Sequence, residues 1–119
     1  MMNQTYLRKM FTQTVAWGEV SPAASSLDAE TTTNHRLQYV RISARKDGRT
    51  LDDSGERTAA TATLYVLAKY STCDDSFTLP AIKDGDEITT ADSRTMIVEG
   101  VKTCYGIGGS VHHLEVTIR

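Results

Sequence analysis

Two cysteines and a histidine pair are the residues whose types could form a metal centre. Cys73, Cys104, His112 and His113 offer two sulfur and two nitrogen donors, a ligand set that zinc accepts. Their spacing argues against such a site, because structural zinc modules bring their ligands in close pairs and both cysteines are isolated. The sequence therefore predicts no metal centre. Both thiols are expected to be free, as in a reducing compartment.

Other chemistry has little local support in the sequence. Asp52 and Asp53 could attract a cation, but no glutamate follows at the spacing of a calcium loop. The chain has no G-x-S-x-G turn, and its glycine cluster at 106–109 precedes an expected strand, whereas a phosphate-binding loop precedes a helix. His35 is expected to be solvated at the start of a strand. We therefore predict no catalytic residue and no cofactor, and we expect that the chain is not an enzyme.

The elements that would position these residues read as strands. Alternation of apolar and polar residues predicts an all-β chain, a small single-domain β-barrel of about six antiparallel strands with at most one short helix. Residues 1–9 are expected to be flexible, and residues 21–34 and 45–59 are expected to be long loops. The strands are predicted at 11–19, 35–44, 60–70, 87–89, 94–102 and 111–119.

Side-chain parity predicts which residues face the core. In the last strand Leu114, Val116 and Ile118 share one face, and His112 belongs to it, so His112 is expected in the core or at the barrel end. A bulge at Gly100 would let Val101 rejoin the interior. The other expected core positions are Val15 and Trp17 of the first strand, with Val40 and Ile42 of the second strand facing away from Leu37 and Tyr39.

The strand at 60–70 is apolar on both faces. Leu64 and Val66 lie on one face, and Tyr65 and Leu67 lie on the other. This pattern is typical of a strand that is covered on both sides or that meets another subunit. Tyr65, Leu67 and the outward-facing His113 are therefore candidate subunit contacts.

Charge and hydropathy exclude some classes of function. The 119 residues include 13 basic and 15 acidic side chains, for a net charge of -2, so a basic surface for gripping nucleic acid is not expected. The first residues lack the apolar core of a secretory signal, and no apolar run approaches the roughly 20 residues of a membrane-spanning helix. We expect a soluble, unexported protein without a membrane partner.

The last third of the chain carries a family resemblance. Its features are the succession Lys83-Asp84-Gly85-Asp86-Glu87-Ile88, the short strand Met96-Ile97-Val98 with Val101 beyond it, and the ending Val111-His112-His113-Leu114-Glu115-Val116 after a glycine-containing loop. Over about residues 77–119 the chain resembles the minor capsid or head-tail connector proteins of tailed bacteriophages and related prophages. It departs from that pattern at Asp92-Ser93, where the family tends to have Asp-Gly.

The resemblance implies a structural role in the virion. Proteins of this stopper or head-completion type form a homo-oligomeric ring under the portal and join the DNA-filled head to the tail. The implied partners are a portal or adaptor protein, tail proteins and double-stranded DNA that passes through the channel without sequence-specific binding. The particle would assemble in the host cytoplasm. The histidine pair would be a structural mark of the barrel.

The residues themselves are compatible with this role. A near-neutral channel would retain a passing duplex less than a basic one, because each phosphate neutralised by lysine or arginine strengthens binding. The mixed-charge segment 45–57 is the candidate channel loop, through Arg45, Lys46, Asp47, Arg49, Asp52 and Asp53. The alternative is a small β-barrel binding module for a peptide or oligonucleotide, which would need a groove lined by exposed Tyr39, Tyr65 and Tyr105.

Overall fold

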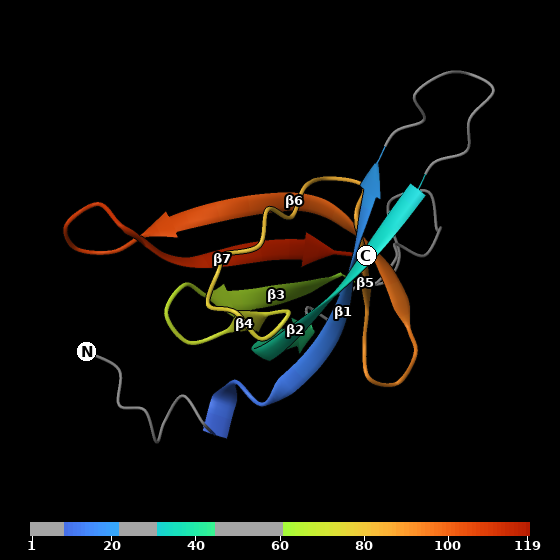
Figure 1. The fold of residues 1–119 in the computed structure, drawn as a ribbon, viewed down its shortest axis with the longest axis horizontal. Helices are drawn as coiled ribbons and strands as arrows, with labels where there is room; N and C mark the ends of the chain where they lie inside the picture. Colours follow the sequence, from blue (N-terminus) through green and yellow to red (C-terminus); the bar gives the residue numbers. More distant parts are fainter. Residues whose placement is uncertain (1–8, 22–30, 45–60) are drawn as a thin grey trace, which may run out of the picture.

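A computed structural model of the chain describes residues 9–21, 31–44 and 61–119 (Figure 1). These residues form strands and turns, apart from a helical turn at Lys9–Met10, so the all-β prediction is confirmed. The strands are β1 (Gln13–Ser21), β2 (Thr31–Ala44), β3 (Ala62–Leu67), β4 (Thr72–Cys73), β5 (Glu87–Thr89), β6 (Thr95–Tyr105) and β7 (Val111–Ile118).

Six of the seven strands close into a ring. Every pairing is antiparallel, and the neighbours follow the order β1, β5, β6, β7, β3 and β2. The pairing of β1 with β2 joins the two ends of this order. The short β4 lies outside the ring, against Leu37 and Gln38 of β2. Each strand of the ring therefore pairs with two neighbours, which shortens the free edges that could pair with other chains.

The ring turns its corners where two long strands change partners. Residues up to Val40 of β2 pair with β1, and Arg41–Ala44 pair with β3. In the same way β6 pairs with β5 up to Ile97 and with β7 from Val98 onward. Each change lies beside a bulge, at Tyr39 in β2 and between Val98 and Gly100 in β6. The predicted bulge at Gly100 is therefore confirmed, and Val101 packs against the core as expected.

The bulge in β2 overturns the predicted faces of that strand. Tyr39 has a positive φ of 59° and occupies the extra position opposite Gln13 and Thr14. It therefore moves Val40 to the side of Leu37, and both side chains are fully buried. Strict alternation had placed them on opposite faces. The hydroxyl of the buried Ser71 donates a hydrogen bond to the Tyr39 carbonyl at 2.6 Å, which satisfies an oxygen that the bulge removes from the ladder.

Several predicted boundaries change. Ser21 belongs to β1 and Thr31–Asn34 belong to β2, so the loop predicted at 21–34 is too long; β-branched threonines favour the strand, and they pair with Glu19–Ser21. The strand predicted at 60–70 ends at Leu67, β6 continues to Tyr105, and β4 forms where a polar turn was expected. The rest of that loop, residues 22–30, and the whole of the segments 1–8 and 45–59 lie outside the described residues.

The core fills the inside of the ring. Val15 and Trp17 are 3% exposed, and Leu114, Val116 and Ile118 are buried, so these predictions are confirmed. Every strand of the ring contributes at least one fully or almost fully buried apolar side chain. The remaining members of this core are Leu37, Val40, Ala62, Leu64, Val66, Ile82, Ile88 and Val98.

Gly18 lies where β1 is paired on both sides. A Cβ atom at this position would lie 3.0 Å from Thr32 Cγ2 and 3.3 Å from the Asn34 side-chain oxygen. Gly18→Ala is therefore expected to lower the free energy of unfolding by roughly 1–3 kcal/mol, because the neighbours must move apart. Urea denaturation followed by fluorescence measures the change. Gly100→Ala is the matched control, since no atom lies within 4 Å of its added Cβ; an equal loss in both variants would contradict the steric explanation.

Candidate functional site

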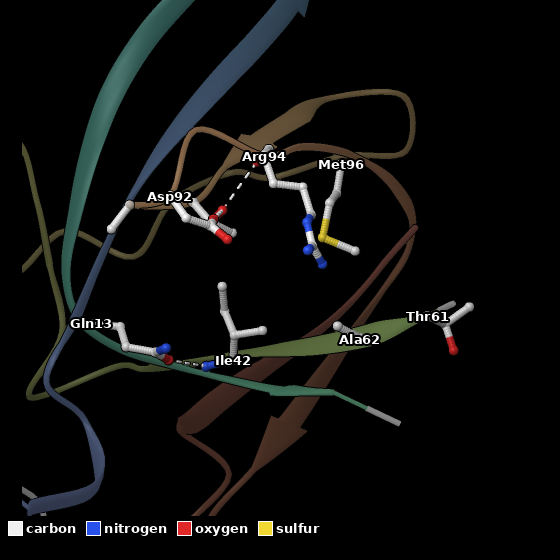
Figure 2. Close-up of a pocket in the computed structure, with 9 residues that line it drawn as sticks. Gln13, Ile42, Thr61, Ala62, Asp92, Arg94 and Met96 are labelled. Carbon is white, nitrogen blue, oxygen red and sulfur yellow. Dashed lines mark hydrogen bonds between the residues drawn. The ribbon is translucent and has the colours of Figure 1, made fainter. Parts of the chain in front are cut away.

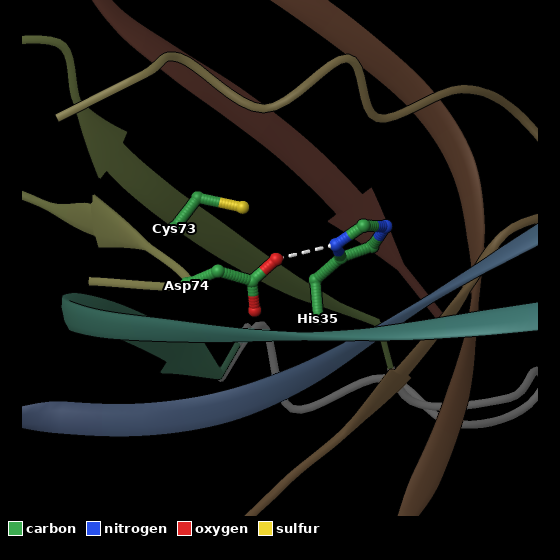
Figure 3. A group of neighbouring side chains, drawn as sticks. All are labelled: His35, Cys73 and Asp74. Atoms are coloured by element: carbon green, nitrogen blue, oxygen red, sulfur yellow. Dashed lines mark hydrogen bonds and ion pairs between the residues drawn. The ribbon is translucent and has the colours of Figure 1, made fainter. Parts of the chain in front are cut away.

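Three donor groups of different chemistry meet at the junction of β2 and β4. One ring nitrogen of His35, the Cys73 sulfur and a carboxylate oxygen of Asp74 all lie within 4.8 Å of one another. Figure 3 shows the Cys73 side chain pointing toward the His35 ring, with Asp74 beside both. His35 Nδ1 and Asp74 Oδ2 are 2.6 Å apart. We call these three residues the His35 cluster.

A tight turn places Cys73 and Asp74 in the cluster. Cys73 and Ser76 are paired through two backbone hydrogen bonds, of 2.7 and 3.0 Å, across Asp74 and Asp75. Both aspartates have positive φ, 51° and 65°, as a two-residue turn of the hairpin type requires. The backbone of Asp74 is tied to β2, because its N–H donates to the Arg36 carbonyl at 2.8 Å. The turn thus holds the Asp74 carboxylate against Arg36, the residue that follows His35.

The groups around the cluster fix the orientation of each side chain. The His35 ring stacks on Trp17 at a centroid distance of 4.5 Å, and His35 Nε2 lies 3.3 Å from Glu19 Oε2. The Arg36 backbone N–H donates to Asp74 Oδ1 at 2.9 Å. The hydrogen bond from Arg36 lowers the pKa of Asp74, and the contact with Asp74 raises the pKa of His35 above 6.5. Burial raises the pKa of the Cys73 thiol, and the nearby carboxylates raise it further.

A buried carboxylate, that of Asp86, supports the cluster indirectly, through Trp17. Asp86 is fully buried, and its oxygens accept hydrogen bonds from Trp17 Nε1 at 2.9 Å and from the backbone N–H groups of Val20 and Lys83. Lys83 Nζ lies 3.1 Å from Asp86 Oδ1. Burial raises the pKa of Asp86, but these four hydrogen bonds lower it by more, so the net shift is downward. Asp86 therefore fixes Trp17, and Trp17 supports the His35 ring.

A second group of donors lies on β6 and β7. Cys104, His113 and Glu115 offer donor atoms within 4.8 Å of one another, because Cys104 and His113 are cross-strand partners. His112 was expected in the core or at the barrel end; it is exposed, so the first of these two positions is wrong. The strand runs past the end of the core there, and a register shift beside Tyr105 breaks its alternation. The two histidines also meet, with their Nδ1 atoms 2.8 Å apart.

The four zinc ligands considered from the sequence do not come together as one set. Among the residues described by the structure, Cys73 is grouped with His35 and Cys104 is grouped with His113. No sequence pattern pairs His35 with Asp74, because 39 positions separate them and no spacing rule connects them. Only the antiparallel pairing of β2 with β4 brings them together.

The candidate subunit contacts fall into two groups. Leu67 is only 7% exposed, so in this conformation it offers little surface to a second copy. The chain turns back directly after it, and the Ser71 N–H donates to the Leu67 carbonyl at 3.1 Å. Tyr65 and His113 are half-buried neighbours on β3 and β7, with ring centroids 6.4 Å apart. A contact through these two residues stays a prediction.

A cavity of about 390 Å³ opens between the β5–β6 turn and the strands β1, β2 and β3 (Figure 2). Arg94 and Met96 reach into it from one side, and Ile42 and Ala62 line the other. None of Tyr39, Tyr65 and Tyr105 belongs to its walls, so it is not the tyrosine-lined groove that a binding module would need. The other lining residues are Gln13, Thr61, Thr90, Ala91 and Asp92.

The hairpin of β6 and β7 projects from the ring and carries apolar side chains at its tip. Ile107 is fully exposed, and Tyr105 is 67% exposed. A tight turn forms the tip, in which the Gly109 N–H donates to the Gly106 carbonyl and Gly108 has a φ of 91°. In Figure 1 this hairpin points away from the end of β1 and the beginning of β2, which are paired with each other. The tip therefore presents apolar surface that the protein's own core does not use.

The remaining predicted residues cannot be placed. Arg45, Lys46, Asp47, Arg49, Asp52 and Asp53, the candidate channel loop, lie outside the described residues. In the part of the chain that is described, no helix is long and apolar enough to cross a membrane.

Comparisons with known proteins identify no relative. No family model matches the chain, and no curated protein and no solved structure matches it either.

Proposed function

We propose that this protein is a structural subunit of the bacteriophage neck, a head-tail connector or stopper that docks under the portal and joins the DNA-filled head to the tail. The sequence resemblance over residues 77–119 motivates the proposal. Two structural features support it: an antiparallel ring that closes within one chain, and a projecting hairpin that is free to contact a neighbouring subunit.

The exposed apolar tip of the β6–β7 hairpin is the observation that carries the proposal. Exposing an isoleucine and a tyrosine together costs hydrophobic free energy, about 25 cal/mol for each Å² of apolar surface that stays in water. Tyr105 and Ile107 would recover this free energy by entering a pocket on the next subunit of a ring or on an adaptor protein. Aromatic and large apolar side chains at the centre of a contact contribute most of the binding free energy in interfaces.

Antiparallel pairing makes the hairpin suitable for this task. Seven residues of β6 are paired with β7 between Val98 and Tyr105, so the tip is carried on a paired two-stranded ribbon with a register shift near each end. A preordered ribbon loses less conformational entropy on docking than a loop that must order first. The same strands continue into the core through Val98 and Ile118, which would transmit a load at the tip to the ring.

Deleting the gene from the phage or prophage that encodes it tests the proposal directly. Under the proposed function, electron microscopy should show filled or leaking heads separate from free tails, and infectious particles should be lost. Supplying the wild-type protein from a plasmid should restore joined particles. Normal numbers of joined, infectious particles without the protein would overturn the proposal.

Ile107→Ser is expected to separate docking from folding. The variant should unfold at the same urea concentration as the wild type, because Ile107 contacts no core residue and is fully exposed. Complementation by this variant should yield at least about tenfold fewer joined particles, as expected for loss of a central apolar anchor. Thr103→Ser, an exposed change on the same hairpin, is the control and should complement fully. Full complementation by Ile107→Ser would exclude the tip as the docking element.

A further inference from the structure

The His35 cluster has the donor set of a transition-metal site. An imidazole nitrogen, a thiol sulfur and a carboxylate oxygen are the three ligand types that zinc combines in proteins. Calcium and magnesium require six or more oxygen ligands, and this cluster supplies a single carboxylate and a sulfur. The donor atoms therefore favour a thiophilic divalent metal such as Zn²⁺ or Co²⁺.

The spacing of the donor atoms is close to that of a metal site. Ligand atoms of tetrahedral zinc lie about 3.3–3.8 Å apart, given metal–ligand distances of 2.0–2.3 Å. The three donors all lie within 4.8 Å of one another, and the closest pair, His35 Nδ1 and Asp74 Oδ2, is 2.6 Å apart. Binding would open this pair by less than about 1 Å and draw Cys73 inward. These changes are small enough to be made by side-chain rotation.

The groups that orient metal ligands in other proteins are already present. Metal-bound histidines commonly donate their second ring N–H to a carboxylate, which leaves the other nitrogen free for the metal. Glu19 lies in this position, 3.3 Å from His35 Nε2, and Trp17 holds the plane of the ring. Asp74 Oδ1 accepts a hydrogen bond from the Arg36 backbone N–H, and this contact directs Asp74 Oδ2 toward His35.

We propose that His35, Cys73 and Asp74 bind one divalent transition metal, with Zn²⁺ as the natural candidate, and that Glu19 positions the histidine. His35 Nδ1, Cys73 Sγ and Asp74 Oδ2 supply three ligands and leave the fourth position to water. Because Cys73 and Asp74 belong to β4 and its turn while His35 belongs to β2, the metal would cross-link these two elements on the outside of the ring. This site does not depend on a role in the phage neck.

Cobalt titration of the full-length protein tests the site. The purified chain, freed of metal and kept reduced with a phosphine, is titrated with Co²⁺ while the near-ultraviolet thiolate-to-cobalt absorption and the fluorescence of Trp17 are recorded. Trp17 is the only tryptophan and is stacked on His35, so a bound Co²⁺ should quench it. We expect one equivalent of Co²⁺ to produce both signals and excess Zn²⁺ to reverse them.

Paired variants decide which cluster binds the metal. Cys73→Ser should abolish the charge-transfer band, and Asp74→Asn, which tolerates the same positive φ, should weaken binding by at least about 100-fold. Glu19→Gln should weaken it by about tenfold through the lost orientation of His35. Cys104→Ser, the matched change at the other cluster, should leave both signals intact. Circular dichroism confirms that each variant is folded.

Two results would overturn the inference. One is the absence of any thiolate-to-cobalt band in the folded wild-type protein at millimolar Co²⁺. The other is a band that survives Cys73→Ser and disappears in Cys104→Ser, which would assign the metal to Cys104, His113 and Glu115.

Discussion

Asp86→Ala is expected to lower the free energy of unfolding by about 3–5 kcal/mol, the largest effect of any single side chain discussed for this protein. The carboxylate is fully buried and accepts from Trp17 Nε1 and from the backbone N–H groups of Val20 and Lys83. Truncation leaves the buried Trp17 N–H and the partly buried N–H groups of Val20 and Lys83 without their acceptor. Urea denaturation followed by Trp17 fluorescence measures the loss, which is a large part of the 5–15 kcal/mol typical of a domain.

Asp84→Ala is the matched control for this prediction. Asp84 lies two positions earlier in the same turn and is exposed, so its removal should change stability by no more than about 0.5 kcal/mol. Acid provides a second readout. Because the pKa of Asp86 lies below its usual value of 3.8, its contribution is complete above that value and is lost as the pH falls through the lower, folded-state pKa. The acid-induced loss of stability should therefore be smaller in Asp86→Ala; equal acid sensitivity in both proteins would contradict this account.

Leu64→Ala is expected to cost about 2–5 kcal/mol, the second large effect. Leu64 is fully buried at the centre of β3, between Ile42 of β2 and Val116 of β7. Removing three carbon atoms from a position enclosed by paired strands leaves a cavity that the ring cannot close without breaking its ladders. The midpoint of urea unfolding should fall, with the slope unchanged.

Tyr65→Ser tests the opposite face of the same strand. Tyr65 is half-buried and points away from the core, so this change should cost much less than Leu64→Ala. If Tyr65 contacts another subunit, the variant should fold and fail in assembly. Leu67→Ser, in contrast, should destabilise the isolated chain, because Leu67 is buried within it. Equal losses for Leu64→Ala and Tyr65→Ser would show that the two faces of β3 are equally buried.

Local patterns in the sequence predicted the regular parts of the fold. The alternation of Leu114, Val116 and Ile118 identified β7 and its inner face, and the Asp-Gly turn before residues 87–89 located β5. Glycine at position 100 marked the bulge in β6. These features depend on side chains a few residues apart, which is why they can be read without a structure.

The bulge at Tyr39 shows where local reading fails. No residue near Tyr39 in the sequence signals its positive φ. The bulge is stabilised by Ser71, which is 32 positions away in the sequence. Strict alternation therefore assigned Val40 to the wrong face. The prediction of a core position for His112 failed for a related reason, because the alternation of a strand continues even where the core beneath it has ended.

By itself, the sequence determined the all-β class and the inner faces of most strands, and it suggested the neck function that is proposed for the protein. Only the tertiary structure decided which strands pair to close the ring and that His35, Cys73 and Asp74 share one site. The physical reason is the range of the interactions involved. Periodicity and turn chemistry act between residues close in the chain, whereas the His35 cluster depends on strand pairing and a buried Asp86 that connect distant segments.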